Sequence, residues 1–140
     1  MEIATSRLQV HSEGENDIID ITPQLAERVV KSGLREGFVN LFVSGSTGAV
    51  TTIEYEDGLL RDFPAMLERV APKNIGYNHE KRWHDGNGHS HVRASLVGPS
   101  LTVPFQDSRL LLGTWQQVVF IELDVHSRKR EIVLQIIGTG

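Results

Sequence analysis

Short segments rich in β-branched and aliphatic residues recur along the whole chain, and they limit its possible folds more than any other feature. They occupy residues 3–10, 17–21, 38–43, 49–55, 92–97, 100–104, 118–123 and 132–137. Glycine, proline or short polar residues bound most of them, which is typical of strands joined by turns. Residues 49–55 fit either a strand or a helical turn, and residues 3–10 and 17–21 are predicted to form an opening hairpin. The chain is therefore expected to consist mainly of β-sheet.

Two other segments have the periodicity of amphipathic helices. The first begins at Thr22 and Pro23, and its apolar residues recur at helical spacing: Leu25, Ala26, Val29, Val30 and Leu34. The second covers residues 59–70 and ends before Pro72. Strands that outnumber helices indicate an α+β fold. We expect a single domain over residues 1–140, in which an antiparallel or mixed β-sheet sandwich is combined with two to three helices.

The composition excludes several classes of protein. Of the 140 residues 39% are hydrophobic, which is enough for one core of ordinary size. A formal net charge of -4 with scattered Lys and Arg provides no basic surface for nucleic acid. The absence of cysteine excludes disulfides, thiolate metal ligands and thiol nucleophiles. No signal peptide or transmembrane segment is recognisable, so we expect a soluble cytoplasmic protein with neither nucleic acid nor a membrane as partner.

Four of the six histidines lie within residues 77–91, together with oxygen donors and turn glycines. Histidine is the most common metal ligand among protein side chains. If residues 89–97 form a strand, His89 and His91 project to the same face, because strand side chains alternate with period two. His79, returned by a glycine turn, would complete a three-nitrogen site for a divalent metal with an open position for water or substrate. The alternative is that these residues only decorate a polar turn.

Two further groups of residues predict an anion site. Arg93 and Ser95 would share the strand face of the histidines, and a guanidinium beside a metal suits a phosphate-bearing substrate. An ordinary surface ion pair of Arg93 is the alternative. The hydroxyl-rich loop at residues 44–48 follows a predicted buried strand, so Ser46 and Thr47 could line a nest for phosphate or carboxylate. A tight turn between two core strands is the competing interpretation.

Several motifs, in order and at compatible spacing, resemble those of a known family. They are Tyr77-x-His79, Asn87-Gly88-His89-Ser90-His91, residues 94–104 (ASLVGPSLTVP) and Leu112-Gly113-Thr114-Trp115-Gln116. Over most of the chain they are similar to the YjbQ-like family, the secondary thiamine-phosphate synthase type proteins. The resemblance implies a compact α+β fold that assembles as a homotrimer. It also implies that His79, His89 and His91 form the metal-binding and catalytic set, with Glu54 as an acidic residue and Asn87 as a residue that shapes the site.

One position departs from the family pattern. Many relatives have a His-Thr-Thr stretch where this chain has Gly45, Ser46 and Thr47. The roles that this imidazole serves elsewhere, as a ligand or in proton transfer, have no counterpart at Gly45. Ser46 and Thr47 remain as hydroxyl contacts.

Three functions are compatible with these residues. The resemblance implies a transferase that condenses a pyrimidine methyl pyrophosphate with a thiazole phosphate, using Zn²⁺ or Mg²⁺ and Arg93 to neutralise the departing pyrophosphate. Imidazole ligands favour Zn²⁺ over Mg²⁺, and Asp85 or Glu54 could add an oxygen. The alternatives are a non-catalytic trimeric module that binds metal and a phosphorylated metabolite, and a purely structural trimer.

Overall fold

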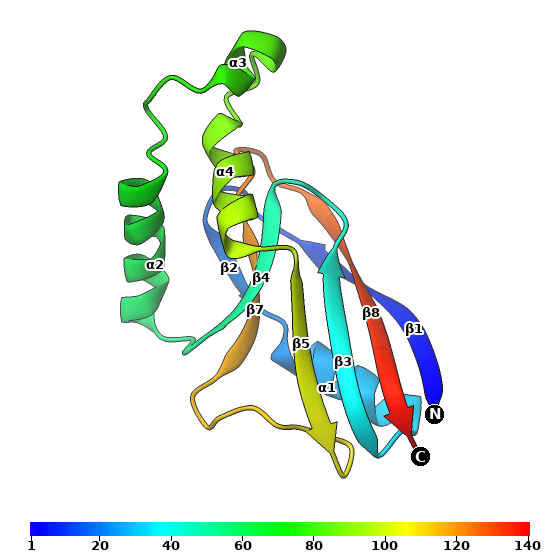
Figure 1. Ribbon diagram of the computed structural model, residues 1–140. Coiled ribbons are helices and arrows are strands. Elements are labelled where there is room, and N and C mark those ends of the chain that lie inside the picture. Colours follow the sequence, from blue (N-terminus) through cyan, green and yellow to red (C-terminus); the bar gives the residue numbers. More distant parts are fainter.

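The computed structural model describes residues 1–140, and most of them lie in strands and helices (Figure 1). The strands are β1 (Glu2–His11), β2 (Asp17–Asp20), β3 (Glu36–Val43), β4 (Gly48–Ile53), β5 (Ser100–Gln106), β6 (Arg109–Leu110), β7 (Gln117–Glu122) and β8 (Lys129–Thr139). The helices are α1 (Thr22–Ser32), α2 (Asp57–Val70), α3 (Asn78–Trp83) and α4 (Gly88–Val97). The predicted α+β class is confirmed, with four helices rather than two to three.

All strand pairs are antiparallel, and they form two sheets. A five-stranded sheet has the order β1-β8-β3-β5-β6, and a three-stranded sheet has the order β2-β7-β4. The predicted hairpin of residues 3–10 and 17–21 is wrong, because β1 pairs with β8 whereas β2 pairs with β7. Pairing along all 10 residues of β1 forms more backbone hydrogen bonds than the 4 residues of β2 could offer.

The three-stranded sheet is covered on both faces, so the protein has two hydrophobic clusters. Val118 and Phe120 of β7 belong to the larger cluster, which lies between the two sheets and α1. Val119 and Ile121 belong to the smaller cluster, together with residues of α2 and α4. Since strand side chains alternate between the faces, both sets of β7 side chains are buried. This explains the continuous apolar run in the sequence of β7.

Residues 92–97 do not form the predicted strand. They are the last turns of α4, which ends at Gly98. A short apolar run bounded by glycine fits a strand and a buried helix segment equally well. Tertiary packing decides between the two, because Ala94 joins the smaller hydrophobic cluster and α4 lies against β4. The difference matters for the site, since residues two apart point to different sides of a helix.

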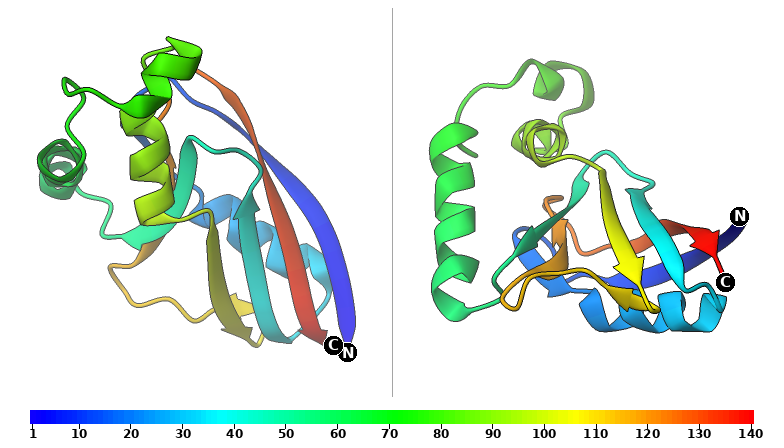
Figure 2. Two further views of the ribbon diagram at one scale, coloured as in Figure 1. Left: turned by 45° about the horizontal axis from the view of Figure 1, so that its top comes forward. Right: turned by 60° about the horizontal axis from the view of Figure 1, so that its bottom comes forward.

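The helices lie on two sides of the sheets. α1 packs on one face of the five-stranded sheet, while α2, α3 and α4 lie on the opposite side of the molecule, beyond the three-stranded sheet (Figure 2). No helix is both long and apolar enough to cross a bilayer. The start of α4, the β3–β4 connection and the β7–β8 connection meet at one end of the molecule, where the candidate site lies (Figure 1).

Candidate metal centre and adjoining cleft

Two histidines and one aspartate come together near the start of α4. His79 lies on α3, Asp85 in the turn between α3 and α4, and His91 on the first turn of α4. One ligand atom from each lies within 4.8 Å of the other two. His79 Nε2 is 3.2 Å from Asp85 Oδ1, and the ring centroids of His79 and His91 are 4.4 Å apart. We call these three residues the metal group.

Asp85 is ionised at neutral pH. The backbone N–H of Asn87 donates to Asp85 Oδ1 at 3.1 Å. This hydrogen bond has the largest influence on the pKa of Asp85 and lowers it. Desolvation acts in the other direction, and the His79 imidazole adds a smaller lowering of the pKa. A carboxylate must be deprotonated to bind a metal, so the turn that contains Asp85 prepares it as a ligand.

The spacing of the metal group fits a transition-metal ion. Bonds of about 2.0–2.2 Å from Zn²⁺ to nitrogen and oxygen place the ligand atoms of a tetrahedral site roughly 3.3 Å apart. His79 Nε2 and Asp85 Oδ1 already have nearly this separation, and a ligand atom of His91 lies within 4.8 Å of both residues' ligand atoms. Three protein ligands would leave at least one position open for water or substrate.

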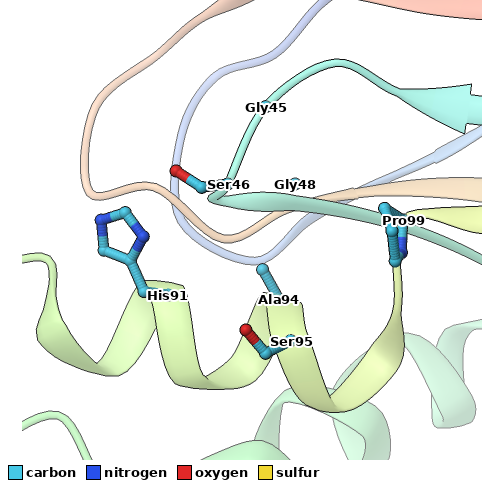
Figure 3. A pocket seen from close by; sticks show the side chains of 7 residues that line it. All are labelled: Gly45, Ser46, Gly48, His91, Ala94, Ser95 and Pro99. Carbon is cyan, nitrogen blue, oxygen red and sulfur yellow. The ribbon is translucent and has the colours of Figure 1, made fainter.

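A cleft of about 290 Å³ opens beside the metal group. Its lining includes Ser46, Asp85, Asn87, His91, Arg128 and Arg130. A second hollow of about 160 Å³ extends from His91 past Ser95 to Pro99 (Figure 3). Figure 3 shows the His91 imidazole projecting from α4 toward the segment that contains Ser46. His91 and Ser46 border both spaces, so the metal group faces solvent through the cleft.

Buried polar residues hold the β3–β4 connection against the start of β8. Arg130 forms a bidentate pair with the carboxylate of Glu122. Its Nη2 atom also donates to Thr47 Oγ1 at 2.7 Å, and Thr47 Oγ1 donates to Asp124 Oδ2 at 2.9 Å. Thr47 is 5% exposed, and its hydroxyl is used within the protein. Thr47 therefore shapes the cleft and is not a free hydroxyl contact for a ligand.

Asp124 and Asn87 connect this network to α4. Burial by itself would raise the pKa of Asp124, but hydrogen bonds from the backbone of His126 and from Thr47, Arg128 and Asn87 lower it. Asn87 Nδ2 donates to Asp124 Oδ2 at 3.3 Å, while Asn87 Oδ1 accepts from the backbone of the β7–β8 connection at 3.1 Å. The predicted site-shaping role of Asn87 agrees with these contacts, since Asn87 joins the start of α4 to the cleft wall.

His89 and Arg93 are buried on a different side of α4. The carboxylate of Glu15 can only accept, so His89 Nε2 donates its hydrogen to Glu15 Oε1. Arg93 Nε donates to the carbonyl of Ala71 at 2.9 Å, and Arg93 Nη2 donates to Glu68 at 2.6 Å. Both residues are 1% exposed, and their contacts join α4 to α2 and to the β1–β2 connection.

The predicted alignment of four side chains on one face is therefore wrong. A strand would align His89, His91, Arg93 and Ser95, whereas a helix aligns residues that are four apart. His89 and Arg93 form one pair in the interior, and His91 and Ser95 form another beside the cleft. The structure does not bring His89 into the metal group or Arg93 into the cleft. Asp85 stands in the place expected for His89.

Comparison with known proteins gives the family. The family model described as "UPF0047 protein YjbQ-like" matches residues 6–139. The chain belongs to the YjbQ-like UPF0047 family. A UPF0047 protein of Methanothermobacter thermautotrophicus is 38% identical over 138 residues, which are 99% of this chain and 94% of the relative. A UPF0047 protein of Archaeoglobus fulgidus is 40% identical over 117 residues, with 84% and 89% covered.

Solved structures of similar proteins have the same fold as this YjbQ-like chain. A YbjQ-like protein of unknown function from Sulfolobus solfataricus P2 is 30% identical with a TM-score of 0.91, over 98% of both chains. A hypothetical protein from Aeropyrum pernix K1 is 28% identical with a TM-score of 0.88, over 96% of this chain and 98% of that one. The predicted family and fold class are thus confirmed.

Glu54 of the YjbQ-like chain is not brought to the metal group. It follows β4 at the end opposite to the β3–β4 connection, and it is exposed. A strand of 6 residues such as β4 spans about 20 Å. Within one chain Glu54 is therefore remote from His91.

Four charged residues beside the cleft were missed by sequence reasoning. They are Glu122, Asp124, Arg128 and Arg130, from the end of β7 to the start of β8. The signal was available, because Glu122 lies at the end of an apolar strand, Asp124 follows it, and a basic stretch comes soon after them. Carboxylates next to a buried strand need charged or hydrogen-bonding partners. Those partners are Arg128 and Arg130.

Proposed function

We propose that this YjbQ-like protein is a metal-dependent enzyme that acts on a phosphorylated small molecule. The convergence of His79, Asp85 and His91 within 4.8 Å, at the edge of a cleft, supports the proposal. Two imidazoles and one carboxylate are a ligand set that catalytic metal sites use with open positions. The same cleft contains Arg128 and Arg130, and guanidinium groups suit phosphate oxygens.

Zn²⁺ or another transition-metal ion is preferred over Mg²⁺. Two of the three donors in the metal group are imidazole nitrogens, which suit Zn²⁺, whereas Mg²⁺ favours oxygen ligands in octahedral geometry. His79 and His91 must be neutral to bind the ion, so its affinity should fall in acid.

The specific reaction proposed is a transfer of the thiamine-phosphate synthase type. The ring nitrogen of a thiazole phosphate forms a bond to the methylene carbon of a pyrimidine methyl pyrophosphate, and pyrophosphate leaves with the electron pair of the broken carbon–oxygen bond. A bound divalent ion would supply positive charge beside the leaving group. Ser46 and Arg128 would orient the substrates from the cleft wall. The attacking nitrogen has no proton to lose, so Gly45 in place of an imidazole removes no required base.

A second function fits the same ligand set, namely a module that binds metal and a phosphorylated metabolite without turnover. The observation that favours it is the position of Glu54, which lies outside the metal group although the family resemblance implies an acidic residue there. Binding and turnover measurements on one preparation distinguish the two functions.

Metal affinity is the first test. Wild-type protein should bind about one Zn²⁺ per chain, and His91→Ala and Asp85→Asn should each weaken binding by more than about 100-fold. His84→Asn is the matched control, because His84 lies in the same segment but is exposed and outside the metal group. Asparagine tolerates the left-handed backbone of His84, whose φ is 54°. Equal affinity in wild type and His91→Ala would contradict the metal site.

Turnover is the second test. Metal-loaded wild type, supplied with the two thiamine precursors, should form thiamine phosphate and pyrophosphate. His91→Ala should lower kcat/KM by at least about 100-fold, whereas His84→Asn should not change it. Binding of both precursors without product would favour the binding module over the enzyme.

The proposal includes assembly as a homotrimer. The face of the five-stranded sheet that points away from the core has a row of apolar side chains across four strands. Ile3 pairs with Ile137, which pairs with Phe38, which pairs with Pro104. Ile3 is 66% and Phe38 39% exposed. Phe42 of the same face is 47% exposed, and such an exposed apolar surface supports an interface with further copies of this chain.

A further inference from the structure

We infer that Arg130 Nη1 is the anion-binding group of the cleft, and that it binds a phosphate group of a ligand that also contacts the metal. The sequence pattern had placed this role on Arg93, which is buried elsewhere. The inference rests on the proposed metal-dependent function and adds the class of ligand to it.

Arg130 is held rigidly but has a free donor. Its Nε and Nη2 atoms bind the carboxylate of Glu122, and Nη2 also donates to Thr47. Nη1 makes no hydrogen bond within the protein, although the side chain is only 10% exposed. Arg130 also lines the cleft that contains His91 and Asp85. A nine-tenths buried guanidinium with an unused donor beside a cleft is a preorganised anion ligand.

Gly45 keeps this donor open. A Cβ built on Gly45 would lie 2.8 Å from Arg130 Nη1, closer than real side chains approach. Glu122 and Thr47 hold the guanidinium in place, so any side chain at position 45 would press on Nη1 or cover it. At the position where many relatives have histidine, this chain therefore presents a guanidinium donor in place of an imidazole.

Arg128 is a second, more exposed cation on the same wall. Its Nη2 atom is 3.0 Å from Asp124 Oδ2, and the side chain is 46% exposed. The remaining donors of Arg128 are free to turn toward a ligand in the cleft. One fixed and one adjustable guanidinium can therefore contact different oxygens of the same anion.

The balance of charges makes anion binding depend on the metal. Glu122 and Asp124 each neutralise one arginine of the cleft wall. Without a metal ion, Asp85 gives the cleft an excess of negative charge, which opposes an anion. A divalent ion held by two neutral imidazoles and Asp85 would give the cleft a net positive charge instead. Phosphate affinity is therefore expected to appear only when the metal group is loaded.

Phosphate fits these groups better than carboxylate. A terminal phosphate has enough oxygens to contact the metal, Arg130 Nη1 and Arg128 at once, whereas a carboxylate has only two. A cleft of about 290 Å³ is at the small end of ligand sites, which begin at about 300 Å³. It is therefore sized for the phosphate end of a metabolite, with the remainder extending along α4 past Ser95.

Inorganic phosphate is the probe, and Co²⁺ is the metal, because its visible absorption reports its own binding and that of a further ligand. Wild type loaded with Co²⁺ should bind phosphate in calorimetry, and protein treated with chelator should bind it at least about tenfold more weakly. Gly45→Ala should weaken phosphate binding by at least about tenfold with unchanged Co²⁺ affinity. Gly113→Ala is the matched control, because a Cβ there would have no neighbour closer than 3.6 Å.

Arg130→Lys should weaken phosphate binding similarly, since lysine keeps the charge but not the fork geometry. If this variant fails to fold because it loses the Glu122 pair, Gly45→Ala decides alone. Normal Co²⁺ binding with undiminished phosphate binding in Gly45→Ala overturns the inference and leaves the proposed metal site intact. Absence of Co²⁺ binding in wild type overturns the proposed function and the inference together. Acetate that binds as tightly as phosphate rules out the ligand class.

Discussion

Two buried arginines of this protein differ in what their guanidinium groups have left to bind. Arg93 is 1% exposed, binds Glu68 and the carbonyl of Ala71, and lies 3.8 Å from Glu15. Arg130 is nearly as buried, yet its Nη1 atom borders the cleft without a partner. The remaining Nη1 of Arg93 lies near the Glu15 carboxylate and away from the cleft, so Arg93 stabilises the fold, whereas Arg130 remains available for binding.

The structural role of Arg93 predicts the behaviour of a substitution. Arg93→Gln should lower the free energy of unfolding by about 3 kcal/mol, the lower end for a broken buried pair, because half-exposed Glu68 can turn to water. Zn²⁺ affinity should not change. Arg69→Gln on α2 is the matched control, since Arg69 is exposed and forms no ion pair. Denaturant unfolding and metal titration measure both quantities, and a stable Arg93→Gln that loses metal or phosphate would contradict this role.

At the scale of elements, α4 joins two networks on different sides. Toward the interior, His89 contacts Glu15 of the β1–β2 connection. Glu15 also accepts from Lys73 of the α2–α3 connection at 2.9 Å. Toward the cleft, Asn87 joins the start of α4 to the β7–β8 connection. The metal group therefore depends on contacts that hold α4 from both sides.

The interior contact predicts how stability changes with pH. Burial would raise the pKa of Glu15, but the hydrogen bonds from Lys73 and His89 lower it below the ordinary 4.5. The unfolded chain then binds a proton more readily than the folded one, so this stabilisation is complete above about pH 4.5 and is lost as the pH falls through the lower folded value.

Glu15→Gln should therefore flatten the loss of unfolding free energy in acid, and should lower stability at neutral pH. Glu13→Gln is the control, because Glu13 is nearby but exposed and its side chain has no partner. Urea unfolding at a series of pH values measures both slopes. An unchanged acid slope in Glu15→Gln would show that Glu15 does not contribute through its ionisation.

At the scale of the whole molecule, the two sheets differ in how many of their faces are covered. The three-stranded sheet is packed between the larger cluster on one side and α2 and α4 on the other. The five-stranded sheet is covered by α1 on one face only (Figure 2). Its outer face has the apolar row that includes Ile3 and Phe38. An uncovered apolar row is the feature through which copies of the chain could associate.

Assembly can be tested on that row. Wild type should sediment as a trimer, and Phe38→Lys should sediment as a folded monomer, since a desolvated lysine would cost about 2 kcal/mol or more at each interface. Val30→Lys on α1 is the matched control, because Val30 is 62% exposed on the opposite side. Analytical ultracentrifugation and circular dichroism measure mass and fold. A monomeric wild type, or a trimeric Phe38→Lys, would exclude this row as the interface.

Most of the secondary structure, and the segment in which candidate ligands gather, could be predicted from the sequence. Periodicity located α1, α2 and most strands within a few residues, because their faces are exposed or buried with a regular repeat. The histidine segment also indicated where candidate ligand atoms come together, since His79 and His91, two of the three predicted ligands, lie close to each other. The partner of β1 could not be predicted, since local pattern says nothing of which distant strand completes a sheet.

The residue types and their spacing determined that this chain is a β-rich α+β protein with a cluster of histidines and no thiol chemistry. Only the tertiary structure decided which side chains share that site. Packing of Ala94 on the three-stranded sheet makes α4 a helix, which moves His89 and Arg93 into the interior and leaves His91 beside Asp85. Chain folding then brings Arg130 to Gly45 from the far end of the sequence. Local sequence cannot specify such contacts, because the free energy that selects them comes from burial between distant elements.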